Sequence, residues 1–413
     1  MFGQYLSISP PRPQYEVADV LRLWIADYRA KYKTTYRQEE VIRAILACRT
    51  PGMGGVVNQC EACGAVQFVF RSCGDSHCPK CGKYRKAEWV VRQKKVELPI
   101  PYFHVTFTTD HALNDLIPAN QQVMLDALFW AVSKTLQEFA RKQWGVQVGI
   151  TAVLHTWGQT MIPHVHLHCI VTGGGLSQDG ERFEQSGEKY LFDVVALSAR
   201  YRERLCRKIK RLYRAGKLKL VGAAAEIDVE QTVKEMRAKK WEVFIKGFEK
   251  VEKLYQYLSR YVHQVAISNQ RILDIDRGEK SVTFVYKDNK DGGQEKEMSL
   301  AGTEFIWRFL WHVLPRGFRR IRHYGLHHSS CRSKLSAARV LFGERAEIPE
   351  TEELNLREWL EELLGEDILN KCPHCGQQTM SRQGIYDSFN FLQLLFISLA
   401  ILATPKREPV PTG

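Results

Sequence analysis

The segment from Pro163 to Val171 alternates histidine with apolar residues. On a β-strand this alternation places His164, His166 and His168 on one face, because successive side chains point to opposite sides of a sheet. A lone histidine is more often structural than metal-bound, whereas imidazoles that converge are typical of metal sites. Three histidines in register beside the run Gly173–Gly175 therefore favour a metal site over a set of buried core residues.

Two tyrosines, Tyr257 and Tyr261, lie four residues apart in a segment that we expect to be helical. At this spacing both phenols share one helix face, one turn apart. Half-buried packing is the commoner reason for such a pair. A phenol with a pKa of about 10 is a poor nucleophile at neutral pH, but a divalent ion that polarises a phosphate makes its attack feasible. The predicted metal site thus makes both tyrosines candidate nucleophiles.

Two CxxCG sequences follow one another in the N-terminal part of the chain. Each places two thiolates on a tight turn, and its glycine permits the bend. Together they predict a tetrahedral site for structural Zn²⁺ with the ligands Cys60, Cys63, Cys78 and Cys81. Cys73 and His77 lie within reach, so the choice of the four ligands stays open. A closed site has no position for substrate, which predicts a folding and docking element.

One further CxxCG sequence begins at Cys372 and includes Cys375. It could share a metal with Cys331, or with His327 and His328, or bind nothing. The chain has 11 cysteines, unevenly placed, and begins without an apolar signal segment. This usage favours a reducing cytoplasm and metal binding over disulfides.

The overall composition indicates a globular protein that binds a polyanion. Of the 413 residues, 44% are apolar and 25% are charged, which excludes a disordered or fibrous chain and predicts two or three domains. The formal net charge of +13 favours nucleic acid as a partner, although solvated charged faces are the alternative. The candidate DNA contacts lie in basic segments around 200–219 and 316–322: Arg207, Lys208, Lys210, Arg211, Arg319, Arg320 and Arg322.

Hydrophobic periodicity predicts an α+β fold with a central sheet. The expected helices cover about 15–50, the residues from 83 onward, 119–143, 200–219 and 241–265. The expected strands cover 102–109, 148–157 and 164–172, with a hairpin formed by 281–286 and 297–300. The apolar stretch 389–403 falls short of the roughly 20 residues needed to span a bilayer, so no membrane partner is expected.

Four segments together resemble the two-tyrosine rolling-circle transposases of the insertion sequence ninety-one family. They are His155–Gln159, His164–His168 with the glycines that follow, Tyr257–Asn269 and Leu314–Gly325. The likeness runs from about residue 15 to residue 345 and includes the zinc module in its usual place. The order of these motifs is more specific than any one of them.

The resemblance implies an HUH endonuclease domain, which has a central antiparallel sheet flanked by helices, at about 99–345. A helical, zinc-binding domain at 1–98 would precede it, and a partly disordered C-terminal extension at 346–413 would follow. The HUH pair would be His166 and His168, which would hold Mg²⁺ or Mn²⁺.

The resemblance leaves the third metal ligand open among His164, Gln159 and Gln264. It implies that Tyr257 and Tyr261 are the two nucleophiles.

The implied function is a bacterial, nucleoid-associated transposase that nicks single-stranded DNA and keeps a 5′-phosphotyrosine link for strand transfer without ATP. Its partners would be single-stranded element ends, target DNA and a second copy of itself. A replication initiator or relaxase with the same chemistry and a catalytically inactive zinc-dependent DNA-binding protein are the alternatives. The zinc module and the motif at 314–325 favour the transposase.

Overall fold

The structure is a computed structural model that forms two compact units. The described residues are 6–8, 13–81, 89, 93, 97–187, 191–248, 254, 265–288, 291–343 and 370–394. The first unit consists of residues 1–82, 268–275 and 351–413, and the second consists of residues 83–267 and 276–350. The described part of the segment predicted as a C-terminal extension therefore belongs to the first unit.

An antiparallel sheet with the strand order β12-β5-β6-β4-β8 forms the centre of the second unit, and β7 pairs with β6. This arrangement confirms the α+β class and the three predicted strands. The strands are β4 (Tyr102–Thr108), β5 (Val146–Trp157), β6 (Pro163–Ser177), β7 (Phe183–Gln185), β8 (Val243–Phe248) and β12 (Ile321–Gly325).

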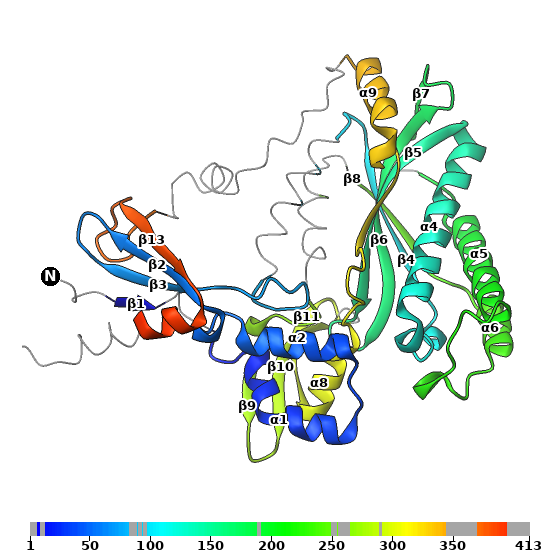
Figure 1. Cartoon of the computed structure of the whole chain (residues 1–413). Helices are drawn as coiled ribbons and strands as arrows, with labels where there is room; N and C mark the ends of the chain where they lie inside the picture. The colour runs from blue at the N-terminus through cyan, green and yellow to red at the C-terminus, as the bar shows by residue number, and fades with distance from the viewer. Residues whose placement is uncertain are drawn as a thin grey trace, which may run out of the picture. The chain divides into compact units, whose positions relative to one another are not determined.

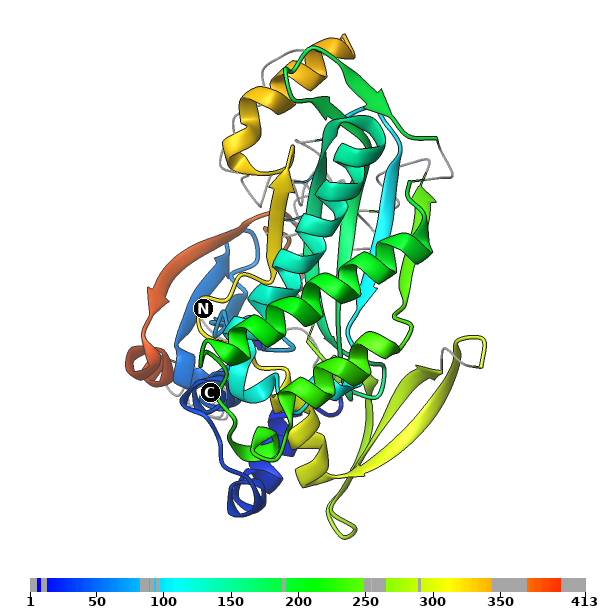
Figure 2. The same cartoon turned by 90° about the vertical axis from the view of Figure 1, so that its right-hand side faces the viewer.

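Three helices cover one face of this sheet (Figures 1 and 2): α4 (Gln121–Trp144), α5 (Val194–Arg214) and α6 (Val229–Ala238). Strand β4 shows why the two faces differ, because Phe103, Val105 and Phe107 join the core under the helices. The alternate residues His104 and Thr106 lie on the opposite face. The sheet thus has one apolar, helix-covered face. The other face carries the buried apolar residues Tyr102, Val153 and Ile170 together with polar side chains, and we call it the polar face.

The remaining described elements of the second unit include a hairpin. Strands β10 (Ser281–Asp288) and β11 (Gln294–Ala301) pair as predicted. Helices α8 (Gly302–Trp311) and α9 (Arg332–Leu341) follow. None of the helices in the described part of the chain has the length and apolar character needed to cross a bilayer.

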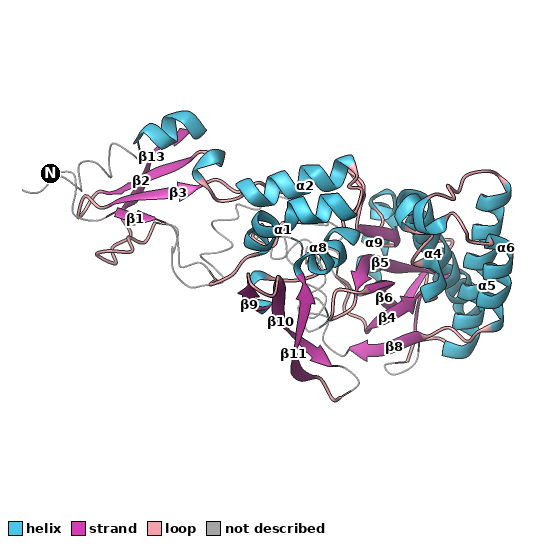
Figure 3. Cartoon of the chain, turned by 90° about the horizontal axis from the view of Figure 1, so that it is seen from below, coloured by secondary structure: helices cyan, strands magenta, loops and turns pink. Residues whose placement is uncertain are grey.

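The first unit contains a four-stranded sheet with the order β1-β3-β2-β13 (Figure 3). Its strands are β1 (Leu6–Ile8), β2 (Gly55–Cys60), β3 (Val66–Phe70) and β13 (Met380–Tyr386). The predicted helix at 15–50 is divided into α1 (Val17–Lys31) and α2 (Tyr36–Ala47). A capping box at Thr35 begins α2 and explains the division. In the sequence, strand β9 (Ile272–Asp276) begins shortly after the motif 257–269.

The helix predicted at 241–265 is wrong at its beginning, because Val243–Phe248 forms strand β8 and pairs with β4. Apart from Leu254, residues 249–264 lie outside the described residues. Both predicted nucleophiles, Tyr257 and Tyr261, and the candidate ligand Gln264 are among them.

Candidate metal centre

Three histidines from two neighbouring strands meet on the polar face of the sheet. His155 of β5 lies directly opposite His166 of β6, and His168 follows on the same strand. Nδ1 of His155 is 2.9 Å from Nε2 of His166, which is 3.0 Å from Nε2 of His168. Two nitrogens bound at right angles to an ion, each at about 2.1 Å, are about 3.0 Å apart. These two distances, and the grouping of all three nitrogens within 4.8 Å of one another, fit ligands of one divalent ion.

Hydrogen bonds around the cluster determine which nitrogen of each ring faces the other histidines. His166 Nδ1 donates to the carbonyl of His164 at 2.8 Å, which leaves the lone pair of Nε2 directed at the cluster. His168 Nδ1 lies 2.9 Å from Nε2 of His104. When His168 Nε2 serves as a ligand, Nδ1 carries the proton and donates to His104. His104 thereby orients His168.

Burial keeps the three imidazoles neutral. Desolvation lowers the pKa of His166 to about 3 and lowers the pKa of His155 and of His168 well below its usual value. Neighbouring histidines lower each pKa further. The neutral imidazole is the form that binds metal, so all three rings are ready to coordinate an ion at neutral pH.

We expect His104→Ala to weaken Mn²⁺ binding about 10- to 100-fold, because His168 would lose the acceptor that orients its ring. Calorimetric titration of the full chain with Mn²⁺ measures the effect. His111→Ala is the matched control, since His111 is exposed and its ring contacts His164 rather than the cluster. Equal affinities for His104→Ala and the unchanged protein would contradict the positioning role.

The structure groups His155, and not the predicted His164, with His166 and His168. Residues directly opposite each other on paired strands are about 5 Å apart, whereas residues two apart on one strand are separated by about 6.6 Å. His155 lies directly opposite His166 in the register of β5 and β6, which explains why it joins the cluster. The His164 ring centroid lies 4.8 Å from that of His166 and 5.5 Å from that of His111, but His164 is not part of the group of three. Gln159 is exposed in the turn between β5 and β6.

The cysteines of the first unit form two groups of four. One group is Cys48, Cys73, Cys78 and Cys81; the other is Cys60, Cys63, Cys372 and Cys375. Within each group the sulfur atoms lie within 4.8 Å of one another. The prediction of one site made from both N-terminal CxxCG sequences is therefore corrected, because each sequence meets a different partner.

The residue that completes the first group with Cys73 is Cys48, which caps the C-terminus of α2. Its sulfur lies 3.5 Å from that of Cys81. His77, the other candidate considered from the sequence, is buried but belongs to neither group. Cys331, His327 and His328 do not join Cys372 and Cys375 either.

Comparisons with known proteins agree with this combination of sites. A family described as "Putative transposase" matches residues 149–334, and one described as "Transposase zinc-binding domain" matches residues 20–109. The putative transposase y4qJ of Sinorhizobium fredii (strain NBRC 101917 / NGR234) is 36% identical over 383 residues, which cover 90% of this chain and 96% of that protein.

The chain belongs to the transposases of the insertion sequence ninety-one family. The transposase for insertion sequence element IS801 of Pseudomonas savastanoi pv. phaseolicola is 28% identical over 297 residues, or 69% of each chain. No solved structure matches the transposase. Its N-terminal region is a zinc-binding domain, which agrees with structural Zn²⁺ held by cysteines. Its partner is DNA.

The basic helix α5 of the transposase is partly neutralised by acidic residues of its neighbours. Glu138 of α4 pairs with Arg200 and Arg204. Glu230 of α6 binds Lys210 at 3.2 Å, and Glu203 of α5 itself binds Arg207 at 2.8 Å. The remaining predicted contacts of this helix are Lys208, whose ammonium lies 5.2 Å from the Trp130 ring centroid, and the exposed Arg211. Helices α4 and α5 both belong to the helix-covered face (Figure 2), whereas the histidines lie on the polar face.

The basic segment 316–322 lies nearer to the histidine cluster. The Arg320 guanidinium carbon is 5.7 Å from the centroid of the Trp157 ring, which lies 4.0 Å from the His155 ring centroid. Arg320 is thus a cation beside the metal centre. Arg322 instead pairs with Asp126 at 2.5 Å and covers Phe129. Arg319 is exposed.

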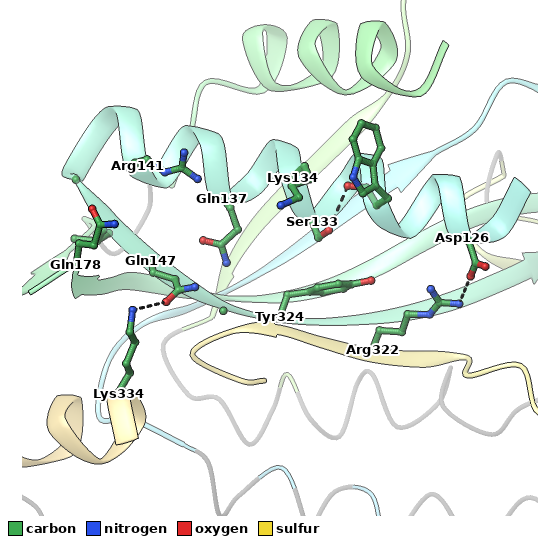
Figure 4. A pocket seen from close by; sticks show the side chains of 14 residues that line it. Asp126, Ser133, Lys134, Gln137, Arg141, Gln147, Gln178, Arg322, Tyr324 and Lys334 are labelled. Carbon is green, nitrogen blue, oxygen red and sulfur yellow. Dashed lines mark hydrogen bonds and ion pairs between the residues drawn. The ribbon is translucent and has the colours of Figure 1, made fainter. Parts of the chain in front are cut away.

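A hollow of about 840 Å³ lies between α4 and β12 (Figure 4). Its cations are Lys134, Arg141, Arg322 and Lys334, and Asp126 is its one carboxylate among the lining residues. Trp130 and Tyr324 add aromatic surface. Cations interleaved with aromatic rings are typical of surfaces that bind single-stranded nucleic acid. We call this hollow the basic groove.

Proposed function

We propose that the transposase is a metal-dependent tyrosine endonuclease and strand transferase with an HUH domain. The observation that carries this proposal is the cluster of His155, His166 and His168, whose nitrogens converge at ligand spacing on the polar face. Three neutral imidazoles fit a divalent ion. The family relationship favours Mg²⁺ or Mn²⁺ at this centre and favours a transposase over a replication initiator or relaxase.

In this proposal His155, His166 and His168 would hold the ion, which would polarise the scissile phosphate and stabilise negative charge on the leaving oxygen. Arg320 lies beside the centre and is placed to pair with the same phosphate. His104 accepts a hydrogen bond from Nδ1 of His168 and thereby fixes the orientation of that ring. These residues position the phosphate and leave the nucleophile to another part of the chain.

We assign the nucleophiles to Tyr257 and Tyr261. The phenol oxygen of one tyrosine attacks phosphorus, which forms a tyrosyl phosphate bond and breaks the bond to the 3′ oxygen. The proton lost by the phenol is balanced by one taken up by the 3′ oxygen, so the products are a 5′-phosphotyrosine and a free 3′-OH. Because a phosphodiester replaces a phosphodiester, strand transfer needs no ATP. The second tyrosine acts on another strand.

The substrate in this proposal is single-stranded DNA from the element ends and the target. A labelled single strand that spans an element end is incubated with the full chain and Mn²⁺. We expect cleavage that EDTA prevents and that a fully double-stranded control lacks. Cleavage that persists unchanged in EDTA would contradict the metal assignment, and no cleavage of either end by a folded chain would favour the catalytically inactive DNA-binding protein.

We expect the paired change Lys134→Ala/Arg141→Ala to weaken single-strand binding more than Arg207→Ala/Lys210→Ala. The cations of the second pair already bind Glu203 and Glu230, so they are less available to phosphates. Each lost phosphate contact lowers the salt dependence of binding by about 0.7 in the log–log slope. Fluorescence anisotropy at several salt concentrations measures both effects. A larger loss of affinity in Arg207→Ala/Lys210→Ala would indicate that single-stranded DNA binds along α5 instead.

A further inference from the structure

The second cysteine group consists of two turns with the same geometry from opposite ends of the chain. One turn runs from Cys60 to Gly64 and the other from Cys372 to Gly376. In each turn the glycine N–H donates to the carbonyl of the first cysteine, at 2.9 Å and 3.0 Å. Gly64 and Gly376 adopt φ values of 70° and 73°, which disfavour any residue with a Cβ. Paired turns of this form are typical of zinc ribbons.

The sulfur atoms of these turns lie at the spacing that zinc requires. The Cys60 and Cys375 sulfurs are 3.7 Å apart, and so are the Cys63 and Cys372 sulfurs. Four sulfurs at about 2.3 Å from a tetrahedral ion are separated by about 3.8 Å, whereas a disulfide requires about 2.05 Å. The distances therefore fit a shared ion and exclude a disulfide in this arrangement.

A hydrogen bond from outside the two turns supports the same set of sulfurs. The Thr379 hydroxyl lies 3.1 Å from the Cys60 sulfur. It can donate to a thiolate, and such outer contacts orient ligands at metal sites. Thr379 belongs to the C-terminal segment and Cys60 to the N-terminal sheet, so this contact also crosses between the two ends of the chain.

The cysteine group lies at one end of a docking surface between these same segments. Strand β13 pairs with β2 along its length, with Met380 opposite Cys60 and Tyr386 opposite Gly55. Phe391 is fully buried, and its ring centroid lies 5.4 Å from that of Phe68 and 5.6 Å from that of Phe70. A Cβ on Gly55 would lie 2.2 Å from the Phe391 ring. The N-terminal sheet is thus shaped to receive the C-terminal segment.

We propose that Cys60, Cys63, Cys372 and Cys375 bind a Zn²⁺ of their own that fastens the C-terminal segment to the N-terminal sheet. This ion is separate from the one held by Cys48, Cys73, Cys78 and Cys81. Cys63 and Cys372 are 309 residues apart in the sequence, so the ion closes a very long loop and holds β13 against the edge of β2. The region that matches the zinc-binding family, residues 20–109, contains only half of these ligands.

Metal analysis of the purified full chain tests the proposal. Cys372→Ser/Cys375→Ser should contain one zinc equivalent less than the unchanged chain, and limited proteolysis should remove its C-terminal segment sooner. Cys331→Ser is the matched control, because Cys331 belongs to neither group, and it should retain the full zinc content. Equal zinc content in the double variant and the unchanged chain would overturn the proposal.

Alkylation of the unchanged chain provides a second test that does not depend on a folded variant. Cys375 is exposed, so a free thiol at this position would react quickly with iodoacetamide. We expect zinc to slow its labelling at least about ten-fold. A chelator should then expose Cys60, Cys63, Cys372 and Cys375 together, as peptide mass spectrometry would show. Rapid labelling of Cys375 in the zinc-loaded chain would contradict the site.

Discussion

His166→Ala and His168→Ala should each lower the rate of single-strand cleavage about a thousand-fold or more, which corresponds to roughly 4 kcal/mol of activation free energy. Each change removes a nitrogen from the three that converge on the polar face. His155→Ala should have an effect of the same size, although it lies on a different strand. Single-turnover cleavage with saturating Mn²⁺ measures all three rates.

His164→Ala is the matched control for these variants. His164 lies on the same strand, but its side chain is outside the group of three, and the carbonyl that accepts from His166 Nδ1 remains in alanine. Most of the cleavage rate should therefore remain. A large loss in His164→Ala together with normal cleavage by His155→Ala would show that His164 is the third ligand. DNA binding should stay within about two-fold in every variant, because Arg320 and the cations of the basic groove are unchanged.

Replacing both Tyr257 and Tyr261 by phenylalanine should abolish the covalent DNA adduct, a loss of about a thousand-fold or more. Phenylalanine keeps the ring and removes only the oxygen that would attack phosphorus. Each single variant should retain one cleavage step and lose strand transfer. A denaturing gel with labelled DNA separates the adduct, the cleaved strand and the transferred strand.

Tyr255→Phe controls for the removal of a hydroxyl group from the same segment, because Tyr255 is not part of the two-tyrosine motif. It should form the adduct at the normal rate. An adduct that persists in the double variant would assign the nucleophile to another residue. It would not change the assignment of the histidine centre.

The sequence predicts the histidine strand well, because alternation of polar and apolar residues reports directly on the two faces of a sheet. The alternation within β6 alone places His166 and His168 on the same face of the sheet. The third histidine, His155, depends on the register between β5 and β6, which periodicity does not determine. His155 is part of the motif His155–Gln159, but only its pairing with His166 on β6 identifies it as a candidate metal ligand.

The cysteines illustrate a different limit. The spacing of Cys60 and Cys63 identifies a metal-binding turn. However, the CxxCG spacing does not indicate which second turn supplies the other two sulfur ligands. The correct partner for this turn lies at the other end of the sequence, at Cys372 and Cys375. Only the pairing of β2 with β13 brings the two turns together.

Elsewhere in the chain, tertiary contacts also overrule predictions made from the local sequence. Val243–Phe248 continues an apolar pattern that resembles a helix, but the free edge of β4 pairs with it as a strand. The charge run of α5 appears one-signed in the sequence, whereas Glu138 and Glu230 reach it from neighbouring helices. In both places the decisive partner lies far away in the sequence.

The most direct test of the proposed chemistry is the position of the label in a covalent complex. The full chain is incubated with Mn²⁺ and an element-end single strand labelled either 5′ or 3′ of the cleavage site, and the products are separated on a denaturing gel. We predict a protease-sensitive, protein-bound band only for the strand labelled 3′ of the site, because a 5′-phosphotyrosine retains that side. A label retained from the 5′ side, or cleavage without any protein-bound DNA, would contradict this chemistry.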